Sequence, residues 1–211
     1  MKLLFASTLL LLATQATFAQ FHYGIKGGVG LTGMDLNQPG ISNSQYRLSY
    51  QAGFYGTQVM GKRFFSTTEL LYANKGFRAD APPIAVGGSP QGHSVHLHYL
   101  SLPVFGGYSI TERIFVMVGL EVSYLMAART RVDSESNNTS FFWQEGFDYG
   151  LAAGAGYRIN QRVNVDIRYV HGLRDVAPNN YRWADPQDPL ATFDFRSQNR
   201  VFQLSLAYQL N

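Results

Sequence analysis

The stretch Asn199-Arg-Val-Phe-Gln-Leu-Ser-Leu-Ala-Tyr-Gln-Leu-Asn211 alternates apolar and polar residues. One parity carries the large apolar side chains, and the other carries small or polar ones: Phe202, Leu204, Leu206, Tyr208 and Leu210 against Gln203, Ser205, Ala207 and Gln209. This period of two predicts a β-strand with one apolar and one polar face. Such a strand needs a partner at each edge, and pairing it with the first strand of the chain would close a barrel.

The composition supports a β-rich protein of one domain. The chain has 211 residues, of which 45% are hydrophobic and 15% charged, with 21 Gly and 13 Tyr; high Gly and Tyr with few charges are unlike a helical enzyme. Residues 1–19 resemble a cleaved secretory signal, with Lys2, a short apolar run and small residues before Gln20. We therefore expect the mature domain to span residues 20–211.

Charge and cysteine content further limit the kinds of protein this chain could be. Loss of Lys2 with the signal lowers the formal net charge from +3 to +2, which is too small to predict binding to nucleic acid. The chain has no cysteine, so an exported protein must be held together without disulfides. After the signal, no run of about 18 apolar residues predicts a transmembrane helix.

The rest of the chain repeats the pattern of the last strand. We predict eight strands, near residues 21–34, 48–60, 63–77, 94–108, 113–127, 145–159, 162–173 and 199–211. The connections alternate between tight turns, at 61–62, 109–112 and 160–161, and long polar segments, at 35–47, 78–93, 128–144 and 174–198. An even strand count with turns at one rim and long loops at the other predicts an eight-stranded antiparallel up-and-down transmembrane β-barrel.

The faces of the strands predict that the apolar side is outside, against lipid. In the fifth strand the apolar parity continues from Ile114 to Met126, opposite Glu121 and Ser123. Aromatic residues gather toward both ends of this face, as in the girdles of membrane barrels. The second and fourth strands alternate less regularly than the others, and at residues 97–103 of the fourth we expect a change of parity with a bulge near Pro103.

Several segments carry a resemblance to a known family. They are the signal ending in Phe18-Ala-Gln20, Tyr23-Gly-Ile-Lys-Gly-Gly-Val-Gly30, Glu69-Leu-Leu-Tyr-Ala-Asn-Lys-Gly76, Tyr99-Leu-Ser-Leu-Pro103 and the alternating last strand. Together they resemble the small porin-family, or PorT-like, outer-membrane β-barrel domain. The resemblance implies a Gram-negative bacterial outer membrane, and assembly through periplasmic chaperones and the barrel-assembly machinery. We expect a monomer without a cofactor.

Charged residues on inward parities form the main candidate site: Lys26, Glu69, Glu121, Asp148, Arg158, Asp166 and Arg168. Unpaired charge in a narrow lumen is costly, so these side chains should pair across the interior. Eight strands leave room for side chains or one small ligand, but not for an open aqueous channel. We therefore expect a filled lumen and a structural or interaction role without catalysis. The alternative is a narrow channel for ions or small solutes.

Two other motifs give weaker evidence for a functional site. Gly28-Val-Gly-Leu-Thr-Gly33 matches the letters G-x-G-x-x-G, but the dinucleotide-binding motif needs a helix opening at its third glycine. We interpret these glycines as relief of crowding inside a small barrel. His96 and His98, which follow His93, are weak candidates for metal ligands because no carboxylate or cysteine stands at a supporting spacing.

The loop-side rim suggests partners. It carries many arginines, whose guanidinium groups could bind the phosphates of lipopolysaccharide: Arg47, Arg78, Arg129, Arg131, Arg174, Arg196 and Arg200. The alternative is that they only keep the loops soluble. A lipid-modifying enzyme would use a histidine with a serine near this rim, and His93, Ser94 and His171 are candidates by location. A soluble barrel of lipocalin type conflicts with the apolar outer face.

Overall fold

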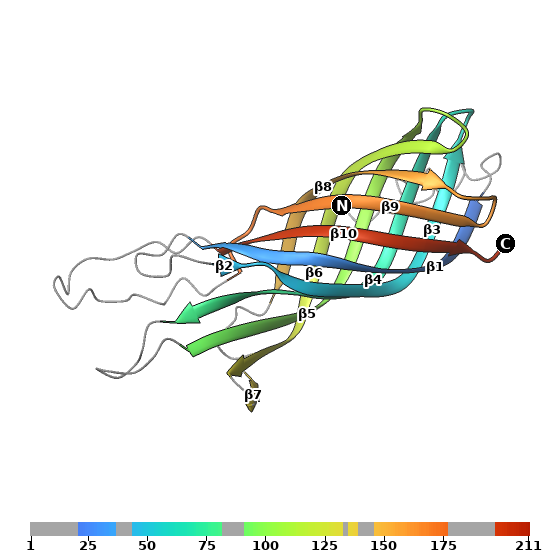
Figure 1. Ribbon diagram of the computed structural model, residues 1–211. Helices are drawn as coiled ribbons and strands as arrows, with labels where there is room; N and C mark the ends of the chain where they lie inside the picture. The colour runs from blue at the N-terminus through green and yellow to red at the C-terminus, as the bar shows by residue number, and fades with distance from the viewer. Residues whose placement is uncertain (1–20, 37–43, 82–90, 133–134, 139–145, 177–196) are drawn as a thin grey trace, which may run out of the picture.

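The computed structural model describes residues 21–36, 44–81, 91–132, 135–138, 146–176 and 197–211, which form one closed antiparallel β-barrel (Figure 1). Eight long strands make its wall: β1 (Phe21–Leu36), β3 (Arg47–Met60), β4 (Phe64–Ala81), β5 (Gln91–Ser109), β6 (Ile114–Val132), β8 (Phe147–Arg158), β9 (Val163–Gly172) and β10 (Ser197–Gln209). Two short strands, β2 (Ser44–Gln45) and β7 (Glu135–Asn138), pair with β4 and β6. The predicted eight-stranded antiparallel up-and-down barrel is confirmed.

Within the described ranges, no helix has both the length and the apolar character needed to cross a bilayer. The expected signal, residues 1–19, lies outside these ranges.

The barrel closes where β1 pairs with β10, from Gly24 opposite Gln209 to Leu36 opposite Ser197. Here the two backbones approach closely: a Cβ atom on Gly30 would lie 2.2 Å from the carbonyl oxygen of Phe202. Glycine is therefore needed at this position for packing. The strand β1 continues past the third glycine of the G-x-G-x-x-G stretch to Leu36 and no helix begins there, so the dinucleotide motif is a coincidence of letters.

The outer face is apolar and the inner face is polar, as the last strand predicts. On β10 the side chains of Leu204 and Leu206 are 49% and 53% exposed, whereas that of Ser205 is 1% exposed. The outward aromatic residues meet in pairs near both ends of the strands, with ring centroids 5.1 Å apart for Phe64–Tyr108 and 5.4 Å apart for Tyr124–Phe147. Such rows of aromatic rings are typical of the two membrane interfaces.

The expected bulge near Pro103 is wrong. The strand β5 keeps one parity throughout, with Leu97, Tyr99, Ser101 and Pro103 all buried. Because proline has no N–H to donate, pairing with β4 is interrupted beside it but resumes in the same register. The irregularity lies on β6 instead: His98 faces Ala127 and Tyr99 faces Leu125, so that Met126 is the extra residue.

The two ends of the barrel differ. At the turn side, tight turns join β3 to β4, β5 to β6, and β8 to β9; Gly61 in the first has a φ of 72°. At the loop side, β4, β5 and β6 are longer than predicted and pair out to Ala81 opposite Gln91. These strands project beyond the rest of the barrel wall (Figure 1).

Candidate functional site

A buried four-residue ion-pair network crosses the middle of the lumen. Lys26 of β1 lies 2.9 Å from Glu69 of β4 and 2.6 Å from Asp166 of β9. Arg168, also on β9, binds Glu69 through two parallel contacts of 2.8 and 2.9 Å and reaches Asp166 at 3.0 Å. The side chains are at most 4% exposed. We call these four residues the central network; it contains two cations and two carboxylates.

A second cluster lies toward the loop side. Lys75 of β4 lies 2.6 Å from Glu121 of β6 and 3.9 Å from Asp148 of β8. Its ammonium group also sits 4.9 Å from the ring centre of Tyr99. Asn199 donates a hydrogen bond of 2.8 Å to Asp148. We call this group the Lys75 cluster.

The structure therefore divides the seven predicted lumen charges. Lys26, Glu69, Asp166 and Arg168 lie together, and Glu121 and Asp148 lie in the Lys75 cluster. Lys75 was not among the predicted lumen charges, although it shares the inward parity of Glu69. The remaining predicted residue, Arg158, belongs to neither group: it lies at the turn-side end of β8.

Apolar side chains line the lumen on both sides of these charges, but on the turn side they leave a cavity, so the filled lumen expected from the sequence is found only in part. One buried cluster, toward the turn side, includes Phe65, Phe105, Phe115 and Met117. The ring centre of Phe105 lies 4.7 Å from the guanidinium carbon of Arg168. Leu97 and Tyr99 belong to another toward the loop side, which includes Met34, Phe77, Leu125 and Val176. An ion crossing the lumen would have to displace both apolar side chains and paired charges.

The predicted rim arginines differ in their exposure. Arg78, Arg129 and Arg131 are exposed on the outer face; Arg174 and Arg200 are half-buried; Arg196 lies outside the described residues. Arg174 donates to the carbonyl oxygen of Phe147, and Arg200 contacts His171 and Tyr169.

The exposed arginines form two rows across three strands. In the upper row Arg78, Ser94 and Arg131 lie opposite one another; in the lower row His96 lies between Gly76 and Arg129. Directly opposite residues of antiparallel strands share one face of the sheet. Arg47 joins from β3, with Nη2 2.7 Å from Nδ1 of His96. We call Arg47, Arg78, Arg129 and Arg131 the loop-side arginine patch.

This patch lies beyond the loop-side aromatic girdle, toward the loops. The row formed by Tyr72, Leu100 and Tyr124 belongs to the aromatic girdle. The lower arginine row is four residues further along the strands, roughly 13 Å of strand length. Among the side chains that the structure describes, no carboxylate forms an ion pair with a member of the patch.

The two histidines of the weak metal prediction face outward beside the patch. His98 is 2.5 Å from the hydroxyl oxygen of Tyr72, and His96 is engaged by Arg47. Burial, and then the nearby arginines Arg47 and Arg131, lower the pKa of His96, which lies above the girdle, to about 4. Among the described residues no group of three or more His, Asp or Glu side chains is arranged to hold a metal ion.

The candidates for a lipid-modifying enzyme are not assembled. Ser94 lies on β5 with its hydroxyl 3.3 Å from His96, whereas His171 lies on β9 and contacts Arg200. The strands β6 and β8 separate β5 from β9 in the barrel wall. The side chain of His93 lies outside the description.

Comparisons with known proteins agree on the architecture. A family model described as outer membrane protein beta-barrel domain matches residues 15–177. The solved structure of Neisserial surface protein A (NspA) has a TM-score of 0.54 at 9% identity, covering 89% of this chain and 97% of that one. Ail, the attachment invasion locus protein of Yersinia pestis, solved with the heparin analogue sucrose octasulfate, has a TM-score of 0.50 at 10% identity, covering 90% and 99%. No curated protein matches the chain.

Proposed function

The chain belongs to the outer membrane protein beta-barrel domain family, and from this premise we propose that it is a porin-family, PorT-like barrel of the bacterial outer membrane whose lumen is closed. In this proposal the protein acts through its surface, as a structural or interaction protein, and carries out neither transport nor catalysis. A cleaved signal and assembly by periplasmic chaperones and the barrel-assembly machinery complete the proposal.

The central network is the main observation that supports a closed lumen. Its four charged groups join β1, β4 and β9 across the interior at distances of 2.6 to 3.0 Å, and each is almost completely buried. Desolvated charges are stable only when they are paired, so the network resists opening toward water. The narrow-channel alternative requires these contacts to break during conduction.

Planar-bilayer recordings test the closed lumen. We expect no single-channel steps from the purified protein, under conditions in which an open porin gives them. Glu121→Gln, which weakens the Lys75 cluster, should lower the free energy of unfolding by about 1 to 3 kcal/mol and still give no steps. Steps in the native protein whose size changes with Glu121→Gln would favour the channel.

The loop-side arginine patch favours a second function, the binding of phosphorylated lipid of the outer leaflet. Three exposed guanidinium groups, those of Arg78, Arg129 and Arg131, lie beyond the loop-side girdle, and Arg78 and Arg131 face outward in one row. Guanidinium groups bind phosphate oxygens through two parallel hydrogen bonds. Lipopolysaccharide carries such phosphates directly above its acyl chains, which matches an arginine row above an apolar band.

Vesicles containing lipopolysaccharide test this second function. We expect Arg129→Gln/Arg131→Gln to weaken binding roughly tenfold, since each charge-assisted contact contributes about 1.5 to 3 kcal/mol before screening by salt. The matched control is Arg63→Gln/Arg113→Gln, which removes two exposed turn-side arginines and should leave binding unchanged. Dephosphorylated lipid should bind the native protein as weakly as the variant; equal binding by all would contradict the proposal.

A further inference from the structure

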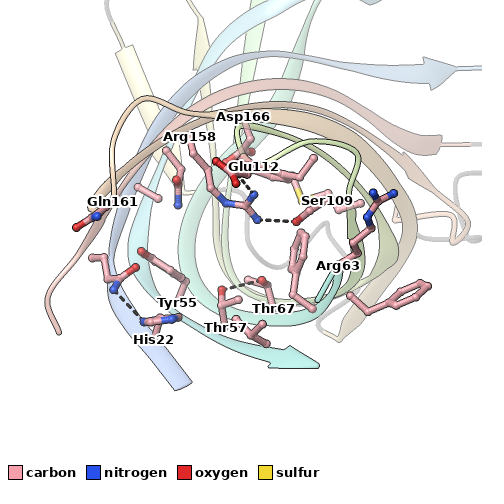
Figure 2. Close-up of a pocket in the computed structure, with 18 of the residues that line it drawn as sticks. His22, Tyr55, Thr57, Arg63, Thr67, Ser109, Glu112, Arg158, Gln161 and Asp166 are labelled. Carbon is pink, nitrogen blue, oxygen red and sulfur yellow. Dashed lines mark hydrogen bonds between the residues drawn. The ribbon is translucent and has the colours of Figure 1, made fainter. Parts of the chain in front are cut away.

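The turn-side half of the lumen contains a cavity of about 810 Å³ (Figure 2). The three tight turns form its mouth, contributing among others Arg63, Glu112 and Gln161. Its floor is the central network, which contributes Lys26, Glu69 and Asp166. The cavity is therefore a blind cup that opens at the turn side, and its volume is in the range of sites for small organic molecules.

The walls of this cavity are apolar on one part and polar on another. Phe65, Phe115 and Met117 supply an apolar wall beneath the turn that joins β5 to β6. Tyr55 and Thr57 of β3 supply hydroxyl groups. The hydroxyl of Tyr55 is buried and has no hydrogen-bond partner among the described residues. A ligand with both apolar and polar parts would match these walls.

Arg158 projects into the cavity and gives it a charge preference. Its guanidinium donates to the carbonyl oxygen of Glu112 at 3.0 Å and to the hydroxyl of Ser109 at 2.9 Å, and it lies 5.1 Å from the ring centre of Phe115. Figure 2 shows it across the cavity from Thr57. Both acceptors are neutral, and no carboxylate among the described residues pairs with Arg158. Three of its five N–H donors remain for a ligand.

The other charges of the cavity leave this cation uncompensated. In the floor, Lys26 and Arg168 balance Glu69 and Asp166. At the mouth, Lys62 and Arg63 outnumber Glu112. A half-buried guanidinium over an aromatic ring, without a carboxylate partner, binds oxyanions well because the planar fork matches two oxygen atoms at once.

We propose that the turn-side cavity is a binding site for a small organic anion, whose carboxylate or phosphate group contacts Arg158 and whose apolar body packs on Phe65, Phe115 and Met117. This site goes beyond the closed-lumen role and does not depend on the loop-side arginine patch. It faces the opposite side of the membrane from that patch.

Protection of an introduced thiol tests the site. The chain has no cysteine, so Thr57→Cys places a single thiol in the cavity wall, and its reaction with the neutral reagent N-ethylmaleimide can be timed in lipid nanodiscs. We expect phenylphosphonate or benzoate to slow the reaction and benzyl alcohol, their neutral counterpart, to have little effect. In the Thr57→Cys background, Arg158→Gln should raise the protecting concentration about tenfold, equivalent to the loss of one charge-assisted contact.

The matched control is Arg113→Gln, an exposed turn-side arginine outside the cavity that bonds Tyr157; it should leave protection unchanged. A heat-dependent shift in gel mobility verifies that each variant is folded. The proposal is overturned if neither anion protects the thiol, if benzyl alcohol protects equally, or if Arg158→Gln has no effect. The comparison of anions with benzyl alcohol needs no change at Arg158, so it tests anion binding in the cavity even if the Arg158→Gln variant fails to fold.

Discussion

Leu206→Lys is expected to lower the free energy of unfolding by about 2 to 4 kcal/mol. Leu206 is 53% exposed on the outer face of β10, between Tyr208 toward the turn side and Phe202 toward the loop side. Phe202 packs on Tyr169, with ring centroids 4.7 Å apart, at the loop-side girdle. Leu206 therefore lies in the middle of the apolar band, where a lysine ammonium has to leave water for hydrocarbon.

Leu210→Lys is the matched control for this change. Leu210 has the same parity and nearly the same exposure, 51%, but lies beyond Tyr208 at the turn-side interface. The cost of charge on a lipid face falls to about 0 to 1 kcal/mol near the interface. Both variants can be unfolded by denaturant from phospholipid vesicles, with the folded fraction read from heat-dependent gel mobility. Equal losses at the two positions would contradict the assignment of the lipid-facing band.

Away from the bulge in β6, the face of each strand could be predicted from the sequence because side chains alternate between the lumen and the lipid. Lys26, Glu69 and Asp166 lie inward as their parity requires. Lys75 could have been found by the same count, since it is six residues from Glu69 on one strand.

Parity alone misplaces the arginines of β6. Counting from Glu121 would put Arg129 and Arg131 inside the lumen, whereas the structure places them on the outer face. The cause is the extra residue Met126, which shifts the alternation by one. A bulge depends on the register of the neighbouring strand, which the periodicity of a single strand does not contain.

Partners across the lumen depend on strand tilt and stagger, which the period of a single strand also leaves undetermined. Asp148 and Arg158, both inward on β8, are ten residues apart and hence roughly 33 Å apart along the strand. They therefore lie at opposite ends of the lumen, one in the Lys75 cluster and one in the turn-side cavity. Sequence reasoning could predict that charges face inward, but not how they divide into groups.

Arg168→Met is expected to lower the free energy of unfolding by about 3 to 5 kcal/mol, because it removes one partner of a buried ion pair and leaves the other uncompensated. Arg168 makes four contacts of 2.8 to 3.1 Å with Glu69 and Asp166. Without it, two buried carboxylates share the single cation Lys26. Arg113→Met, which changes an exposed turn-side arginine, serves as the control and should change stability by about 0.5 kcal/mol or less.

The double variant Glu69→Met/Arg168→Met should be less destabilised than either single variant, because charge balance returns. Glu69→Met alone leaves two cations facing Asp166, and Arg168→Met alone leaves two carboxylates facing Lys26. In the double variant Lys26 and Asp166 keep their contact of 2.6 Å, and methionine fills the space of the lost pair. Denaturant unfolding from vesicles gives the four free energies of this cycle. Additive losses would mean that the four groups act separately, and the closed lumen would then need another physical cause.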